Sequence, residues 1–161
     1  MICAIPESGN IEYHVVEVDG VCELGARIFQ GDIRICFHSS PPNSITDVDI
    51  VHLGTSLHYI EDWRGMLGKL AGYQPQYYLF DDLQAGDIPT YATSQTYYGS
   101  KIPCWFFNVG EIFDAMADLG FDLLLKSIYL ATILGHQQEL PQANFPEEYQ
   151  LGHACSLLFR P

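Results

Sequence analysis

Runs of β-branched and aromatic residues alternate with helix-spaced segments along this chain, and the alternation limits the folds open to it. Four runs are bounded by Gly, Pro, Ser or acidic residues, as is typical of strands. They are 13–18, 33–38, 48–53 and 76–82. Strands that alternate with helices call for a largely parallel sheet, so we expect an α/β fold.

Three segments have the apolar spacing and the end signals of helices. Gly31 follows the first where a C-terminal cap belongs. Two acids precede the second at its electropositive N-terminal end, and Asn108 can cap the third. The expected helices are 21–29, 63–72 and 109–119.

The chain closes with two more apolar segments, 121–132 and 153–160. Because only a proline-containing loop joins them, we expect an antiparallel pair at one end of the sheet. The stretch 83–107 is turn-rich and aromatic, and its length predicts a lid or substrate loop rather than a plain connection. We expect one domain over residues 1–161.

Length and composition exclude several classes of protein. A chain of 161 residues with 48% apolar and 17% charged residues can bury an ordinary core and is not disordered. Its net charge of −13 argues against binding nucleic acid or an anionic membrane surface. The longest apolar run, 121–135, is too short to span a membrane, and the N-terminus lacks a secretory pattern, so we expect a cytoplasmic address.

Neither the cysteines nor the histidines show the spacing of a metal site. The five cysteines lie far apart with no C-x-x-C pair, which favours reduced thiols over a disulfide framework or a zinc site. His52 and His58 lie near Glu61 and Asp62, but their spacing matches no recurring zinc motif. We therefore predict no metal site and expect His52 to be buried in its strand.

Four blocks of the sequence carry a family resemblance: YHVVEV, VDIVHLGTSLHYIEDWRGML, YYLFDDL and TSQTYYGSKIPCWFF. Together they resemble a group of bacterial S-adenosylmethionine-dependent methyltransferases often found among polysaccharide-biosynthesis genes. The likeness covers about residues 12–135, and LHYIEDW and IPCWFF are its most specific parts. It implies the Rossmann-like methyltransferase fold from its second strand onward, S-adenosylmethionine as cofactor, and a small polar or saccharide-like acceptor.

The resemblance places the cofactor at the ends of two strands. Glu17 would bind the ribose hydroxyls, a role that suits a carboxylate because charge-assisted hydrogen bonds are strong. Gly54, Thr55 and Ser56 would line the cofactor cleft, since ligands of open α/β sheets bind beyond the carboxyl ends of the strands. From the residues alone, Glu17 is equally well a solvated strand end.

Five residues are candidates for the chemistry of the acceptor. His58 and Asp81 are candidate bases for an acceptor that must lose a proton. Tyr59, Gln95 and Trp105 are candidates for binding it, because aromatic walls with a few amides suit a sugar-like molecule. The structural alternatives are packing beneath the long loop, a turn at the acidic pair, and aromatic cover for the sheet.

The first ten residues, MICAIPESGN, do not supply the strand and glycine-rich loop with which the complete fold begins. We therefore expect a truncated chain that lacks the central strand and has weak or no affinity for the cofactor. We also expect the open strand edges to be covered by another chain in a homo-oligomer such as a dimer.

Two other functions stay open. One is a non-catalytic, methyltransferase-like binding or assembly protein that completes its sheet by oligomerisation. The other is a different nucleotide-binding α/β protein.

Overall fold

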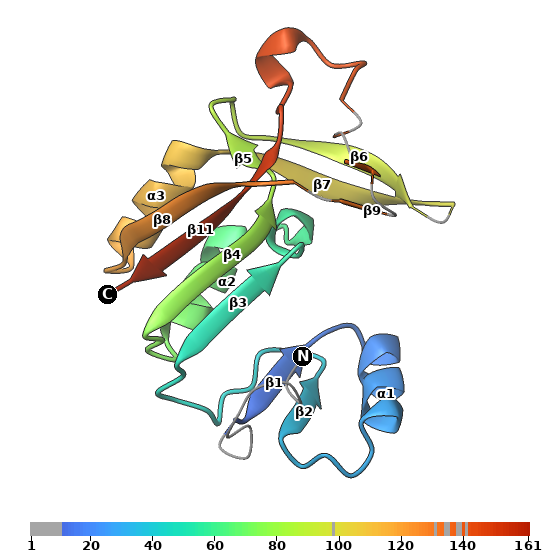
Figure 1. Cartoon of the computed structure of the whole chain (residues 1–161), viewed down its shortest axis with the longest axis vertical. Coiled ribbons are helices and arrows are strands. Elements are labelled where there is room, and N and C mark those ends of the chain that lie inside the picture. Colours follow the sequence, from blue (N-terminus) through green and yellow to red (C-terminus); the bar gives the residue numbers. More distant parts are fainter. Residues whose placement is uncertain (1–10, 98, 131, 134–135, 138–139, 141) are drawn as a thin grey trace. The chain divides into compact units, whose positions relative to one another are not determined.

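The computed structural model describes residues 11–97, 99–130, 132–133, 136–137, 140 and 142–161 (Figure 1). The chain divides into two compact units, Met1–Ile45 and Thr46–Pro161. Each unit has its own sheet and at least one helix. The expectation of one domain over the whole chain stays a prediction.

The described part of the first unit is a β–α–β arrangement. Strand β1 (Tyr13–Val16) pairs in parallel with β2 (Ile35–His38), and helix α1 (Asp19–Ile28) connects them. The ring of Phe37 occupies the space beside Gly25, where a Cβ atom would overlap it. Glycine at this helical position therefore lets α1 approach the sheet closely.

Helix α1 begins two residues earlier than the sequence predicts. Asp19 and Gly20 follow the first predicted strand as a turn signal, yet both lie in the first turn of α1. A carboxylate there is stabilised by the positive end of the helix macrodipole, which explains why the turn signal is overridden. Strands β1 and β2 are each two residues shorter than the sequence predicts.

The second unit is built on a four-stranded sheet in the order β3-β4-β11-β8. Its strands are β3 (Ile50–Gly54), β4 (Tyr77–Leu83), β8 (Asp122–Tyr129) and β11 (Ala154–Arg160). β3 and β4 are parallel, whereas β11 is antiparallel to both β4 and β8. The α/β class and the closing antiparallel pair are confirmed.

Both helices predicted for this unit are confirmed, as is the predicted cap at Asn108. The carboxylate of Asp62 accepts a hydrogen bond from the Gly65 amide at 3.0 Å and caps α2 (Trp63–Ala71). The Asn108 side chain likewise accepts from the Gly110 amide at 2.9 Å and caps α3 (Val109–Asp118). No α-helix among the described residues combines the length and apolar character needed to cross a bilayer.

The core of the second unit lies between the sheet and these helices, which Figure 1 shows on one side of the sheet. Tyr78 is fully buried, and its hydroxyl donates to the Leu67 carbonyl of α2 at 2.9 Å. Phe80 packs against Tyr78 on the same strand and edge-on against Phe159 of β11. Because side chains alternate between the two faces along a strand, Tyr78 and Phe80 of β4 lie on the same face of the sheet.

The other face of this sheet is apolar and exposed. Ile50 and Leu125 are each 56% exposed to solvent, and Tyr77 is 40% exposed. Leu79 and Leu158 lie beside them and are half-buried. Among the described residues of the second unit, α2 and α3 pack on the opposite face. His52 shares the exposed face with Ile50, so the prediction of a buried histidine is wrong.

The stretch 83–107 is a β-hairpin rather than a loop, which corrects the prediction. Strand β6 (Tyr91–Tyr97) pairs antiparallel with β7 (Ser100–Asn108), and the short β5 (Ala85–Gly86) pairs in parallel with the end of β7. The many aromatic and β-branched residues favour strands. Gly99, at a φ of 81°, supplies the left-handed conformation that the connection needs.

The remaining described elements are short. β9 (Thr132–Ile133) and β10 (His136–Gln137) form a small antiparallel ladder. Two 3₁₀ turns, η3 (Leu57–Tyr59) and η4 (Glu147–Tyr149), lie after β3 and before β11.

Replacing Gly25 by alanine should destabilise the first unit by about 1–3 kcal/mol, because the new methyl group overlaps the Phe37 ring and overpacks the helix–sheet contact. Hydrogen exchange of the β1 and β2 amides measures this locally. Gly20→Ala is the matched control, since nothing lies within 4 Å of its added Cβ. Equal exchange in the two variants would contradict the close packing.

Candidate functional site

The carboxyl ends of β3 and β4 meet at one edge of the sheet, where Gly54 pairs with Asp81. The Thr55 amide donates to the Asp81 carbonyl at 3.0 Å, which extends the ladder by one residue. The Thr55 hydroxyl donates to a carboxylate oxygen of Asp82 at 3.1 Å. This edge is where open α/β sheets bind their ligands.

The backbone is strained at two facing positions of this edge. Thr55 and Asp82 have φ values of 51° and 52°, a left-handed region that non-glycine residues seldom adopt. Asp82 lies in a β-bulge, because Asp81 and Asp82 together face the single residue Ser156 of β11. Bulges and strained residues concentrate at functional sites, where they redirect side chains.

The bulge gives the two acids different environments. The Ser156 hydroxyl donates to the Asp81 carboxylate, which fixes its orientation. Burial raises the pKa of Asp82; the hydrogen bond from Thr55 opposes that shift, and the charge of Asp81 adds to it. The predicted base Asp81 is thus an oriented carboxylate with a second acid beside it.

His58 is buried in η3 with 1% of its side chain exposed. Neither ring nitrogen has a hydrogen-bond partner among the described residues. Burial lowers the pKa of this imidazole to about 4, so it is neutral at pH 7. Its ring meets that of Tyr59 edge-on, with the centroids 4.2 Å apart. An unpaired buried imidazole is costly for stability and is able to accept a proton.

The neighbouring Tyr59 connects this turn to the hairpin. Its hydroxyl donates to the side-chain oxygen of Gln95 in β6 at 3.0 Å. The structure therefore brings together two of the residues that the sequence singled out for binding an acceptor.

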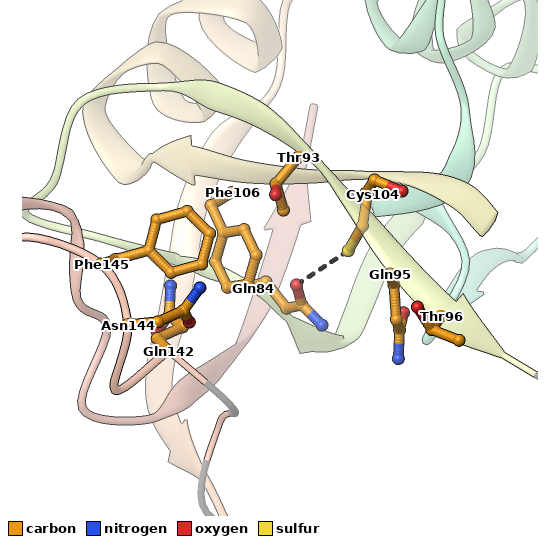
Figure 2. A pocket seen from close by; sticks show the side chains of 10 residues that line it. Gln84, Thr93, Gln95, Thr96, Cys104, Phe106, Gln142, Asn144 and Phe145 are labelled. Carbon is orange, nitrogen blue, oxygen red and sulfur yellow. Dashed lines mark hydrogen bonds between the residues drawn. The ribbon is translucent and has the colours of Figure 1, made fainter.

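Gln95 also lines a pocket of about 340 Å³ between the hairpin and the segment before β11 (Figure 2). Figure 2 shows Phe106 and Phe145 with two amide side chains at one end, and Gln95 with Thr96 at the other. The pocket is lined by Gln84, Thr93, Ser94, Gln95, Thr96, Cys104, Phe106, Gln142, Asn144 and Phe145. Its volume falls within the range of small-molecule sites.

Among the described residues that line this pocket, none has an acidic, basic or imidazole side chain. The one titratable group among these described residues is the thiol of Cys104, which donates to the Gln84 amide oxygen at 3.3 Å. Burial raises the pKa of this thiol to about 11, so it stays protonated at neutral pH. The pocket is therefore polar and uncharged, although the chain has a net charge of −13.

One wall of the pocket is held by a buried glutamine. Gln142 is 4% exposed; its side-chain nitrogen donates to the Tyr91 hydroxyl at 2.6 Å, and its oxygen accepts from the Leu151 amide at 2.8 Å. The Tyr91 hydroxyl donates onward to the Tyr149 carbonyl at 2.8 Å. These bonds attach the segment before β11 to the hairpin, so the pocket is preformed.

Two other predicted site residues lie elsewhere. Glu17 follows β1 in the first unit and is exposed, and no described residue donates a hydrogen bond to its carboxylate. Trp105 alternates with Cys104 and Phe106 along β7, so it faces the other side of the hairpin and stacks on Phe107 at 6.4 Å. Trp105 is not among the pocket residues.

The sequence did not indicate the amides of Gln84, Gln142 and Asn144. Gln84 directly follows β4 and lies two residues after Asp82, a position that could have drawn attention to it. Gln142 and Asn144 lie in a segment read only as a connection, and their role depends on contacts with a hairpin some 50 residues earlier.

Comparison with solved structures shows a shared fold. A Listeria monocytogenes protein assigned as an S-adenosylmethionine-dependent methyltransferase matches with a TM-score of 0.67 and 10% identity, over 96% of this chain and 82% of that one. A Mesorhizobium loti S-adenosylmethionine-dependent methyltransferase matches with a TM-score of 0.60 and 13% identity, over 96% and 83%.

A third match is the 1,6-didemethyltoxoflavin-N1-methyltransferase of Burkholderia thailandensis, solved with 1,6-didemethyltoxoflavin and S-adenosylhomocysteine bound. Its TM-score is 0.55 at 14% identity, over 90% of this chain and 57% of that one. No protein-family model matches the chain, and no curated protein matches it in sequence. The Rossmann-like methyltransferase fold expected from the sequence is confirmed.

The buried imidazole of His58 should make the chain less stable in mild acid. In the unfolded chain it regains its ordinary pKa of 6.5, so between pH 6.5 and about 4 the unfolded state binds a proton that the folded state does not. The free energy of unfolding should therefore fall as the pH drops through this window, which urea titrations at several pH values measure.

His58→Leu should flatten the pH dependence in that window. His153→Gln is the control, because His153 is exposed and should leave the slope as in the parent chain. A parent chain whose stability is constant between pH 6.5 and 4, or a slope that survives in His58→Leu, would contradict the buried neutral imidazole.

Proposed function

We propose that this protein is an S-adenosylmethionine-dependent methyltransferase that acts on a small, uncharged polar acceptor such as a saccharide precursor. One observation supports it most directly: a preformed, uncharged pocket lies next to the carboxyl ends of β3 and β4 in a methyltransferase fold. The bacterial polysaccharide-locus type indicated by sequence resemblance agrees with an acceptor of this class.

The pocket suits such an acceptor for two reasons. Amides and hydroxyls offer both donors and acceptors of hydrogen bonds, as the hydroxyl groups of a sugar require. Phe106 and Phe145 supply the apolar surface on which the C–H face of a sugar ring packs. A charged acceptor would lack a counter-ion among the described residues that line the pocket.

The sequence resemblance assigns polar groups in each of the two units to the adenosyl part of the cofactor, and each unit is described by itself. In the first unit, Glu17 is an exposed carboxylate just after β1, free to accept from two ribose hydroxyls. In the second unit, Gly54 ends β3 and Thr55 and Ser56 follow it, where a strained backbone and a threonine hydroxyl offer polar contacts. When bound, S-adenosylmethionine would supply an activated methyl group.

The chain's own residues would orient the acceptor and take up its proton. Gln95, held by Tyr59, is a positioning group at one end of the pocket. Neutral His58 behind Tyr59, or Asp81 oriented by Ser156, would accept a proton where the acceptor must lose one.

Titration with S-adenosylhomocysteine, followed by amide resonances in two-dimensional NMR, tests cofactor binding even when it is weak. We expect shifts at Glu17 and at Gly54–Ser56. Glu17→Gln should weaken binding about 10- to 100-fold, because charge-assisted hydrogen bonds contribute about 1.5–3 kcal/mol.

Glu23→Gln is the matched control, since it removes the same charge from an exposed position on α1. The proposal fails if no resonances shift at saturating ligand, or if Glu17→Gln and Glu23→Gln bind equally. NAD and ATP, titrated in the same way, separate a different nucleotide-binding protein from a methyltransferase.

A second candidate is a non-catalytic methyltransferase-like protein that assembles with copies of itself. The exposed apolar face around Ile50, Tyr77 and Leu125 favours it, because contiguous apolar patches mark association surfaces. Among the described strands, β3 and β8 also form the two open edges of the four-stranded sheet.

Light scattering after size exclusion tests this candidate. We expect a homodimer in the parent chain, and Leu125→Glu should shift it to monomer, because the charge would be buried in the contact. Ile128→Glu is the control: Ile128 is similarly exposed, at 59%, but points to the other face of β8. A monomer at high concentration in the parent chain would contradict the assembly.

A further inference from the structure

Residues of metal-ligand type gather on one face of the first unit, the face turned away from α1. Phe37 points toward α1, so its neighbours Cys36 and His38 lie on the opposite face of β2. His14 pairs with Cys36 in the parallel register, which puts the two on the same face. Glu12, two residues before His14, completes the group.

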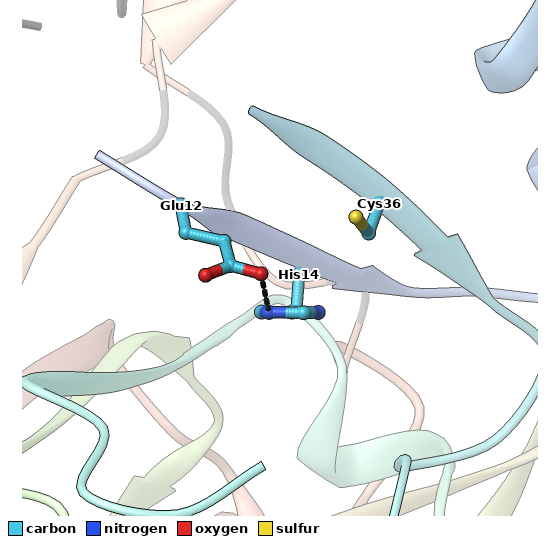
Figure 3. A group of neighbouring side chains, drawn as sticks. All are labelled: Glu12, His14 and Cys36. Carbon is cyan, nitrogen blue, oxygen red and sulfur yellow. Dashed lines mark ion pairs between the residues drawn. The ribbon is translucent and has the colours of Figure 1, made fainter. Parts of the chain in front are cut away.

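The side chains of Glu12, His14 and Cys36 converge. One ligand atom from each lies within 4.8 Å of those of the other two (Figure 3). His14 Nε2 is 3.1 Å from Glu12 Oε1. Ligand atoms of a tetrahedral zinc ion lie about 3–4 Å apart, given metal–ligand bonds of about 2.0–2.3 Å. A small closing movement of three partly exposed side chains therefore reaches that geometry.

A fourth residue, His38, determines through a hydrogen bond which nitrogen of His14 carries the proton. His14 Nδ1 lies 2.9 Å from His38 Nε2, and the two rings are stacked with centroids 5.1 Å apart. When the His14 proton is on Nδ1, it is donated to His38, and Nε2 presents a lone pair to the Glu12 carboxylate. Two lone pairs at 3.1 Å repel each other unless a cation lies between them.

The same contacts are also satisfied without a metal. If the His14 proton is on Nε2 it is donated to Glu12, and His38 Nε2–H donates to His14 Nδ1. A change of tautomer in both His14 and His38 therefore converts a satisfied hydrogen-bond chain into a set of side chains with a lone pair free to bind a metal. Metal-binding histidines are usually oriented in this way by a partner on the other nitrogen.

We infer that Glu12, His14 and Cys36 bind a divalent zinc ion, with His38 orienting His14. A thiolate, an imidazole and a carboxylate are the donor types that zinc accepts, and a thiolate disfavours magnesium and calcium. Binding releases the Cys36 thiol proton to solvent and forms the zinc–sulfur bond. The two anionic ligands then balance the charge of the ion, and water completes the coordination.

The first unit has a physical use for such an ion. Among its described residues only Gly25 and Pro41 are buried, and none of the large apolar side chains is. Units of this size usually need a metal, a disulfide or association with another surface. An ion held by residues of β2 and of the segment entering β1 would tie the two strands together.

Zinc and cobalt titrations of the whole chain test the site. We expect one high-affinity equivalent of Zn²⁺ by calorimetry and a higher melting temperature in its presence. Co²⁺ should give a thiolate-to-cobalt charge-transfer band. X-ray absorption of the zinc-loaded parent chain should show one sulfur neighbour and the rest nitrogen or oxygen, and this measurement needs no variant that could misfold.

Substitutions assign the ligands. Cys36→Ser and His14→Ala should each weaken zinc binding more than about 100-fold, and Cys36→Ser should abolish the cobalt band. His38→Ala should weaken it about 10- to 100-fold, as is typical of an outer hydrogen-bonding partner. Cys22→Ser is the matched control, since Cys22 is a half-buried thiol of the same unit that bonds to the Glu17 and His38 carbonyls.

The inference is overturned if the parent chain binds no zinc, if absorption shows no sulfur neighbour, or if Cys36→Ser keeps the affinity and the cobalt band. Loss of the band in Cys22→Ser but not in Cys36→Ser would also overturn it, because another thiol would then be the ligand.

Discussion

The parallel ladder between β3 and β4 is the constraint on which the candidate site depends. It sets Gly54 beside Asp81, and its continuation by the Thr55 amide brings the two strand ends into contact. Asp81 and Asp82 both face Ser156, a single residue of β11, so the register between β4 and β11 shifts at the bulge. β4 then leads directly into the segment that forms the hairpin. Main-chain hydrogen bonds therefore position the hairpin wall of the pocket, whereas the side chains of Gln142 and Tyr91 attach the opposite wall.

A second feature of the candidate site is that its buried titratable groups Cys104 and His58 are uncharged. The Cys104 thiol stays protonated and the His58 imidazole stays neutral for the same reason: removal from water disfavours the ionised form of each. Among the described lining residues, amides and hydroxyls are then the strong polar groups that a ligand in the pocket meets. In a chain with a net charge of −13, such a pocket disfavours the binding of anions.

Much of the fold was readable because local signals and tertiary packing agree. The caps at Asp62 and Asn108 are chemical signals that act within one helical turn, and both helices begin where these residues predict. The hairpin was misread as a loop because its Gly99 and Pro103 are turn signals, while the strand pairing that overrides them depends on the register of two segments. His52 differs from its prediction because it lies on the face of the sheet that the helices α2 and α3 do not cover.

The sequence by itself determined the order of the elements, the α/β class, the candidate acid at the end of β1 and the residues of the loop after β3. These follow from periodicity, capping and turn chemistry, which act over a few residues. Only the tertiary structure decided that Gln142 walls a pocket with Tyr91, that Trp105 faces away from it, and that Glu12, His14 and Cys36 converge. Each of these depends on strand register and on which face a side chain takes, and a shift of one residue would reverse the outcome.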